Sequence, residues 1–375
     1  MKYLLPGVIL DSELKLEEFS DFEAENPSSF AVPEISLKMV EEEPDSEVKR
    51  TFAHAQINIS EIEGGWLFSN VTGKAKLLVS EDYRKLTAWV AEEKYMEPLK
   101  TNLLRTALEC ASVANGIVSF HSACVEADGF AVAFTGKSGT GKSTRANAWI
   151  ENLGYSFVSG DRPAIFSENG VLTVSGVPWD GKEKIYRNVR LPLKAILDVH
   201  RSDNEFFELR ELTQKQKFRV LMQQAFIPMW DTKTASGVIG MLHVLSRKAP
   251  MFRLFCGPDG ESAKKTHDVL FNHPELIKEA RPEMKVKDGF TLRNVIGENI
   301  LMPTGDNIGK FDGTVIFNDV SAFVWEKMQT PVSREDLLGA ILGEFEVDKE
   351  TAEKDLDALI EKFSSLGLID ENATD

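Results

Sequence analysis

The first part of the chain shows short runs in which hydrophobic and polar residues alternate, a pattern typical of strands with one buried face. The runs at 51–59 and 64–70 fit this pattern, and the second run begins with two glycines that can turn the chain. Residues 97–116 change to helical spacing and end at Asn115-Gly116, a good stop signal for a helix. The sequence therefore predicts that 1–115 is β-rich and ends in a helix.

The apolar start, MKYLLPGVIL, is superficially like a signal peptide. Its apolar stretch is short, contains Pro6 and lacks a small-residue cleavage site, so we interpret it as a first strand. No run approaches the ~18 apolar residues of a membrane-spanning helix, so no membrane partner is expected.

Strand-like and helix-like runs follow one another between residues 116 and 273. The strand-like runs are 118–126, 130–136, 155–161, 163–168, 171–177, 193–199 and 251–256, and the helix-like runs are 145–154, 216–226, 236–246 and 261–272. Asp128-Gly129 and Asn169-Gly170 are strong turn signals, so two of the strand pairs should be hairpins. This mixture predicts an α/β domain over 116–273.

The end of the chain differs in kind. After a linker at 274–284, residues 285–375 contain two or three short strands and then three helices. The strand-like runs are 290–295, 299–304 and 314–318, and the helix-like runs are 321–329, 334–345 and 350–367. The pattern predicts a small, separate α+β domain.

Composition narrows the class of protein. The 375 residues are 42% hydrophobic and 27% charged, with a net charge of −16. Residues 285–375 hold nineteen acids and nine bases, or −10 of that charge. An acidic surface repels phosphate backbones, so nucleic acid is not expected as a partner. Three cysteines without a CxxC pair indicate buried, reduced thiols and a cytoplasmic location.

The run GKSGTGKST, between a strand-like and a helix-like segment, fits the P-loop pattern in full. Its glycines allow consecutive N–H groups to face an anion at a helix N-terminus. Lys142 is expected to reach the β- and γ-phosphates and Ser143 to supply a hydroxyl to Mg²⁺, so ATP and Mg²⁺ are the expected cofactors. The predicted nucleotide-binding residues are Gly136, Lys137, Ser138, Gly139, Thr140, Gly141, Lys142, Ser143 and Thr144. The alternative is a chance match on a glycine-rich turn.

Two further side chains are placed near the phosphates by the predicted topology. Asp161 follows an apolar strand about 18 residues after Ser143, where a carboxylate could hold Mg²⁺ or accept a hydroxyl proton. His121 begins the strand that pairs with the one feeding the P-loop, and the hairpin with its tip at Asp128 brings it to the same end of the sheet. The alternatives are a turn-initiating aspartate and a structural histidine.

The loop 178–190 is dense in charge and could clamp phosphates or substrate, with Lys182 and Lys184 as candidates. Asp180 and Glu183 lie beside them. A solvated loop is the other interpretation.

The order of His121, GKSGTGKST and FVSGD resembles the HPr kinase/phosphorylase family, over roughly 115–270. That resemblance implies a P-loop fold related to phosphoenolpyruvate carboxykinases and transfer of phosphate to a protein serine. It also implies a catalytic set of His121, Lys142 and Asp161, with Ser143 and Asp161 at the metal. Gly160 departs from the family, which usually has an acid there. This leaves open which carboxylate is the base and whether a reverse, phosphorylase reaction exists.

Residues 285–371 resemble PqqD-type peptide-recognition domains, through ILMPTGDNIGKFDGTVIFNDVSAFVWEKM and the helices that follow. The resemblance implies a small winged-helix-like domain that captures the leader of a ribosomally made precursor peptide as an added strand. An open sheet edge is suited to that mode of binding. The expected peptide contacts are Val315, Ile316, Phe317, Leu356, Leu359 and Phe363. The same side chains could simply form the domain's core.

Together these features predict an ATP-dependent kinase that phosphorylates a Ser or Thr of a peptide or protein recruited by the C-terminal domain. A nucleotide-gated peptide-binding protein, and phosphoryl or nucleotidyl transfer to a small molecule, remain alternatives. The sequence leaves open the peptide, the accepting residue, the choice between ATP and GTP, the role of residues 1–110 and the oligomeric state, a homo-oligomer being one option.

Overall fold

The computed structural model describes residues 1–25, 32–178, 185–201, 207–281, 283–308, 311 and 315–370. The chain forms two compact units, Met1–Glu279 and Ala280–Asp375. The boundary falls inside the predicted linker, where a short 3-10 helix, η5 (Pro274–Leu276), ends the first unit. None of the described helices is long and apolar enough to cross a membrane.

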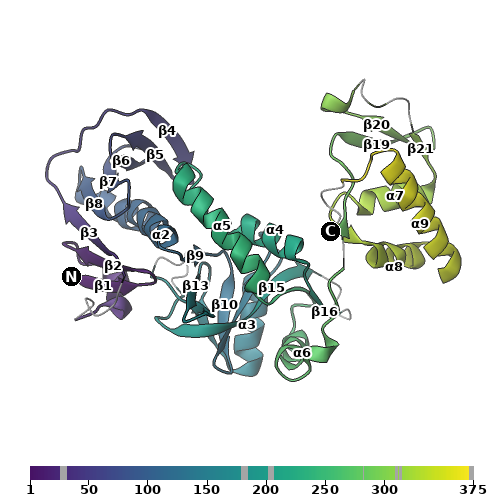
Figure 1. Ribbon diagram of the computed structural model, residues 1–375, viewed down its shortest axis with the longest axis horizontal. Coiled ribbons are helices and arrows are strands. Elements are labelled where there is room, and N and C mark those ends of the chain that lie inside the picture. Colours follow the sequence, from purple (N-terminus) through teal and green to yellow (C-terminus); the bar gives the residue numbers. More distant parts are fainter. Residues whose placement is uncertain are drawn as a thin grey trace. The chain divides into compact units, whose positions relative to one another are not determined.

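The first unit begins with an eight-stranded sheet of order β1-β2-β3-β8-β7-β6-β5-β4 (Figure 1). Its strands are β1 (Lys2–Leu5), β2 (Val8–Ser12), β3 (Glu34–Met39), β4 (Arg50–His54), β5 (Ile57–Ile62), β6 (Gly65–Asn70), β7 (Ala75–Ser80) and β8 (Lys85–Val90). A 3-10 helix, η1 (Glu17–Phe22), follows β2.

The prediction of a single strand over the first ten residues was wrong. Two antiparallel strands form, because Gly7 takes φ +78° and turns the chain. The run 51–59 is likewise split into two strands at Ala55, which has φ +50°.

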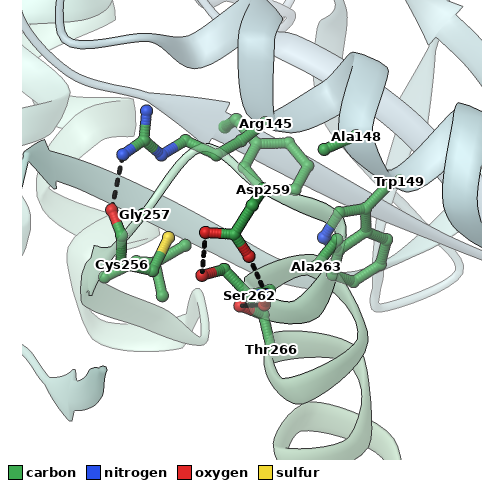
Figure 2. A pocket seen from close by; sticks show the side chains of 11 residues that line it. Arg145, Ala148, Trp149, Cys256, Gly257, Asp259, Ser262, Ala263 and Thr266 are labelled. Atoms are coloured by element: carbon green, nitrogen blue, oxygen red, sulfur yellow. Dashed lines mark hydrogen bonds between the residues drawn. The ribbon is translucent and has the colours of Figure 1, made fainter. Parts of the chain in front are cut away.

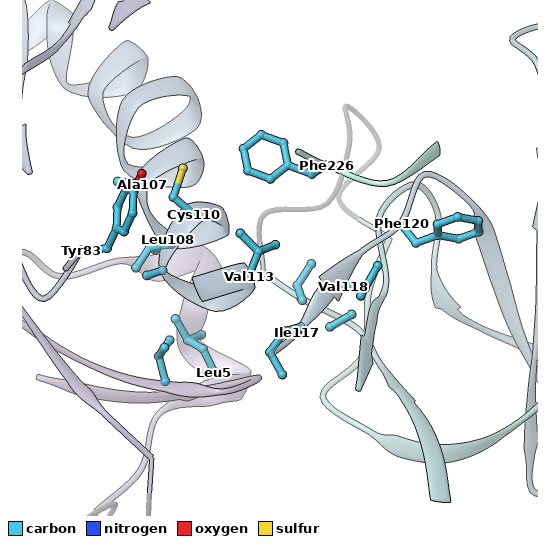
Figure 3. Close-up of a cluster of buried hydrophobic side chains, with 14 of the residues drawn as sticks. Leu5, Tyr83, Ala107, Leu108, Cys110, Val113, Ile117, Val118, Phe120 and Phe226 are labelled. Carbon is cyan, nitrogen blue, oxygen red and sulfur yellow. The ribbon is translucent and has the colours of Figure 1, made fainter. Parts of the chain in front are cut away.

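The helix predicted at 97–116 is confirmed. It comprises the short η3 (Glu93–Tyr95) and α1 (Met96–Pro98), the π-helical η4 (Leu99–Leu104) and α2 (Arg105–Ala114). Every residue from Thr106 to Val113 is buried. Figure 3 shows side chains of α2 beside those of the first sheet and of the segment that follows: Leu5, Tyr83, Leu108, Cys110, Val113, Val118 and Phe120. Because these side chains share one core, residues 1–115 and 116–273 form one unit rather than two.

Among the described residues, the second sheet of this unit has nine strands, in the order β12-β10-β11-β15-β14-β13-β9, with β17 beside β15 and β16 beside β17. The strands are β9 (Val118–Ser119), β10 (Ala123–Ala127), β11 (Phe130–Thr135), β12 (Ser156–Ser159), β13 (Ala164–Glu168), β14 (Val171–Ser175), β15 (Arg190–Arg201), β16 (Glu208–Glu211) and β17 (Met251–Cys256). Both predicted hairpins are confirmed, with Asp128-Gly129 and Asn169-Gly170 at positive φ in their turns.

The helices of this region are α3 (Lys142–Leu153), α4 (Gln214–Gln224), α5 (Thr232–Lys248) and α6 (Gly260–Phe271). Alternate residues of β11 face opposite sides of the sheet. Val132 and Phe134 pack in one core with Trp149 of α3 and residues of α6, whereas Ala131 and Ala133 belong to the core that holds α2, α4 and α5. The sheet is thus covered on both faces, with its strand ends left to carry the site.

Gly237 and Gly240 lie inside α5, and a Cβ added at either would meet nothing within 4 Å. Glycine inside a helix costs about 0.5–1 kcal/mol relative to alanine. Gly240→Ala is therefore expected to raise the free energy of unfolding by about that amount, measured by urea denaturation. Gly260→Ala is the contrasting control, because its Cβ would lie 2.2 Å from the Asn152 side chain and should destabilise. An unchanged or lower free energy of unfolding in Gly240→Ala would contradict the conclusion that the space beside Gly240 is open.

The second unit contains a two-stranded pair and a three-stranded sheet of order β19-β20-β21. The strands are β18 (Glu283–Met284), β19 (Phe290–Val295), β20 (Glu298–Pro303), β21 (Val315–Phe317) and β22 (Val332–Ser333), and the helices are η6 (Gly305–Asn307), α7 (Asp319–Lys327), α8 (Arg334–Glu344) and α9 (Lys349–Ser365). The side chains of Asn318, Ser333 and Asp348 cap the three α-helices. The unit has its own core around Trp325.

Candidate functional site

The P-loop leaves the end of β11 and enters α3, as the motif predicts. Gly136, Gly139 and Gly141 have φ values of +136°, +80° and +95°, which favour glycine. A Cβ at Gly136 would lie 3.0 Å from the carbonyl oxygen of Val199 on the neighbouring strand. Gly141 is the N-cap of α3 and offers no side-chain acceptor, so the helix N-terminus is not capped by its own residue. A glycine-rich loop that leads into an uncapped helix N-terminus is suited to binding the phosphates that the motif implies.

The lysine of the motif curls over the loop. The Lys142 Nζ donates a hydrogen bond to the carbonyl oxygen of Gly136, at 3.1 Å. Burial lowers the pKa of Lys142, and the negative charge of Asp161 partly offsets that effect. Ser143 and Thr144 are exposed at the first turn of α3. Their hydroxyls are accessible to a ligand of the loop.

His121 and Asp161 meet beside this loop, although forty residues separate them. The His121 Nε2 lies 3.1 Å from the Asp161 Oδ1, and each side chain is about one-third exposed, at 36% and 34%. The Ser122 N–H donates to the Asp161 carbonyl oxygen at 2.8 Å, which fixes the two segments together. The hydrogen bond from His121 and the charges of His121, Arg162 and Arg105 lower the pKa of Asp161 against the opposing effect of burial. The carboxylate is therefore ionised at neutral pH, as a base or a metal ligand must be.

The candidate loop lysines, Lys182 and Lys184, lie outside the described residues, as do Asp180 and Glu183. The next described residue, Ile185, accepts a hydrogen bond from the Gly160 N–H at 2.8 Å.

A second carboxylate, Asp198, was not singled out from the sequence. Asp198 lies opposite Thr135 in the parallel pairing of β11 and β15. Thr135 is the residue directly before the P-loop. Asp198 is buried, and its Oδ2 lies 3.0 Å from the His200 Nε2 and 3.4 Å from the Arg253 Nε. Burial alone would raise its pKa, but these two partners outweigh burial and the pKa lies below its usual value. In the sequence Asp198 lies inside the strand-like run 193–199 and is followed by Val199, so no strand-end position distinguished it as Asp161 was distinguished.

Arg145 fastens the P-loop to the turn after β17. Its guanidinium, which is 6% exposed, donates to the Thr140 carbonyl oxygen at 3.2 Å and to the Cys256 carbonyl oxygen at 2.6 Å. Figure 2 shows Arg145 reaching across the space between α3 and the start of α6, where Asp259 caps the helix through Ser262. A side chain at Gly141 would meet this guanidinium at 2.3 Å. The glycine and the arginine therefore set the loop's shape together.

In the second unit, the predicted peptide contacts fall into two groups. Phe317, Leu356 and Phe363 are core residues, and the rings of Phe317 and Phe363 lie 5.2 Å apart. Val315 and Leu359 are half-buried, and Ile316 is 59% exposed. On the strand order of the described residues, β21 is an edge strand.

Residues 299–369 match the family model described as "Coenzyme PQQ synthesis protein D (PqqD)". The C-terminal unit is similar to PqqD. The match covers most of this unit and leaves residues 1–298 and 370–375 outside it. No curated protein matches the chain.

Solved structures are similar to parts of the chain. The Hpr(Ser) kinase/phosphatase from Coxiella burnetii is 13% identical, and the alignment covers 42% of this chain and 90% of that one, with a TM-score of 0.24. TbiB1 in complex with the TbiA(beta) leader peptide is 20% identical, with 24% and 96% covered and a TM-score of 0.21. Lasso peptide synthetase B1 complexed with the leader peptide is 20% identical, with 23% and 96% covered and a TM-score of 0.20. At such scores, the function must be argued from this chain's own site.

Proposed function

We propose that this protein is an ATP-dependent kinase that phosphorylates a Ser or Thr hydroxyl of a ribosomally made peptide, or of a protein, recruited by the C-terminal unit. The observation that carries the proposal is the convergence of the P-loop lysine with an ionised carboxylate. The negative charge of Asp161 acts on Lys142, and the His121 Nε2 lies 3.1 Å from the Asp161 carboxylate. A phosphate-binding loop beside a positioned base is what phosphoryl transfer to a hydroxyl requires.

In this mechanism the loop N–H groups and Lys142 hold the β- and γ-phosphates. Asp161 accepts the proton of the substrate hydroxyl while the hydroxyl oxygen forms a bond to the γ-phosphorus. The bond between the γ-phosphorus and the β–γ bridging oxygen breaks, and ADP is released. The His121 Nε2–H keeps the carboxylate oriented. The exposed Ser143 hydroxyl and the carboxylate of Asp161 are suitable ligands for Mg²⁺, which would neutralise charge on the phosphates.

The C-terminal unit supports the choice of a peptide as substrate. It matches the PqqD model, and the edge strand β21 exposes Ile316 beside the half-buried Val315. An open edge accepts an extended chain by backbone pairing. We therefore propose that a leader segment binds as an added strand along β21, with Leu359 among its side-chain contacts.

Gly160 favours a second function. Where the HPr kinase pattern has a pair of acids, this chain has Gly160 and Asp161. With a single carboxylate at that strand end, nucleotide binding could gate peptide presentation to a separate modifying enzyme without any transfer.

One measurement separates these functions. The full chain is incubated with ATP, Mg²⁺ and a precursor peptide encoded by a neighbouring short reading frame, and the peptide is weighed. A gain of about 80 Da, for one phosphate on a Ser or Thr, supports the kinase. Peptide binding that depends on nucleotide, with no gain in mass, supports the gated binder. Transfer to a small molecule but not to the peptide would overturn both.

Ile316→Pro is expected to weaken peptide binding by at least about tenfold, because proline removes a backbone donor from β21. Nucleotide affinity should stay unchanged. The assay is fluorescence anisotropy of a labelled leader titrated with the full chain. Asn294→Pro is the matched control, since Asn294 of the opposite edge strand β19 pairs with Asn299, and successive residues of β20 hydrogen-bond alternately to its two neighbours. Equal losses in both variants, or none in Ile316→Pro, would exclude capture along β21.

A further inference from the structure

Glu109 is a buried charge for which the proposed mechanism gives no role. It lies on α2 and is 4% exposed, whereas glutamate is seldom fully buried without a partner. Its Oε1 lies 3.2 Å from the Arg162 NH1 and also accepts a short hydrogen bond from the Ser119 hydroxyl. Arg162 directly follows Asp161. A residue of the N-terminal region therefore reaches the segment that carries the candidate base.

We propose that Glu109 is a positioning residue for Asp161 and acts through Arg162. The inference rests on the proposed function, and it places a residue of the N-terminal region beside the candidate site.

In this arrangement Glu109, on the buried helix α2, binds Arg162. The backbone at 160–163 is thereby kept where Asp161 contacts His121.

The anchor is rigid because α2 is buried on most sides. Figure 3 shows Leu108 and Cys110, which flank Glu109 on the helix, within the shared apolar cluster. A helix in such a core cannot shift without opening it. Glu109 is thus a fixed point to which a half-exposed arginine can be tied.

The segment that follows Arg162 is tied to the same place by its backbone. The Phe120 N–H donates to the Pro163 carbonyl oxygen at 3.2 Å, and Ala164 pairs with Ser119, the residue whose hydroxyl contacts Glu109. The segment that follows Asp161 is therefore held by one side-chain contact, Glu109–Arg162, and by backbone pairing to 119–120. Without this pair, Arg162, the residue next to Asp161, loses its contact with the buried Glu109 while the strands themselves remain paired.

The test is a double-mutant cycle on the full chain with Glu109→Gln, Arg162→Gln and the combined variant. The kcat for ATP turnover should fall about tenfold to a hundredfold in each single variant, because a displacement near 1 Å is enough for such a loss. KM for ATP should change less than about twofold, since the P-loop is untouched. The combined variant should be no slower than the worse single variant, because both changes break one interaction.

Glu208→Gln is the matched control, since it removes a partner of the buried Arg210 in another ion pair of the same unit. It should leave kcat unchanged. Additive losses in the combined variant, an unchanged kcat in Arg162→Gln, or an equal loss in Glu208→Gln would each overturn the proposal. Arg162→Gln keeps the test decisive if Glu109→Gln fails to fold, because the arginine side chain is 27% exposed.

Amide hydrogen exchange over 159–163 separates this inference from the proposed function. Both single variants should exchange faster than the wild type there, and the combined variant no faster than either. If the wild type turns over no ATP but the exchange pattern is found, the kinase proposal fails and the positioning role stands. Unchanged exchange in both single variants would overturn the positioning role whatever the activity.

Discussion

Lys142→Ala is expected to abolish tight ATP binding, with a loss in affinity of at least about 100-fold, and with it any turnover. The Lys142 ammonium already points back over the loop, within 3.1 Å of the Gly136 carbonyl oxygen, so it borders the space that phosphates would occupy. Hydrogen bonds to charged groups contribute about 1.5–3 kcal/mol each, and a lysine bridging two phosphates supplies more than one.

Isothermal titration with ATP and Mg²⁺ measures this change, and a thermal melt confirms that the fold is intact. Lys264→Ala on the exposed face of α6 is the control, because it removes an equal charge away from the loop. It should bind ATP as the parent does. Unchanged affinity and turnover in Lys142→Ala would show that this loop is not a nucleotide site, and the function proposed above would fall with it.

Asp161→Asn should still bind ATP but transfer phosphate at least about 100-fold more slowly, the usual span for a lost general base. The amide has nearly the shape of the carboxylate but cannot accept the proton. The hydrogen bond from His121 can persist to the amide oxygen, so the geometry at 3.1 Å should survive. Single-turnover transfer to the peptide isolates this chemical step from product release.

Asp198→Asn is the informative comparison, because Asp198 is the other carboxylate at this end of the sheet. It is paired with His200 and Arg253 and is nearly inaccessible, so its loss should affect transfer less than the loss of Asp161. If Asp161→Asn is almost fully active, Asp161 is only a turn residue. A larger loss in Asp198→Asn, or in a carboxylate of 178–183, would then identify the base.

The sequence by itself determined the elements and the loop. Hydrophobic period and turn residues located the two hairpins, the helix 97–116 and the three C-terminal helices, because these depend on local preferences of the backbone. The course of the loop GKSGTGKST between β11 and α3 could be predicted because the motif places glycine where the backbone takes positive φ, as Gly136, Gly139 and Gly141 do. The separate C-terminal unit was likewise evident from a break in pattern and charge.

The tertiary structure decided what depends on contacts between distant segments. Glu109 and Arg162 are 53 residues apart, and no local pattern pairs them. Asp198 gains its place only through the parallel register of β15 against β11. The same holds for Leu356 and Phe363, which a helical pattern marks as apolar without saying whether they face the core or a groove. Residues 1–115 could not be assigned to the candidate site from sequence, because the ion pair that links them to it, between Glu109 of α2 and Arg162, forms only when two sheets share one core.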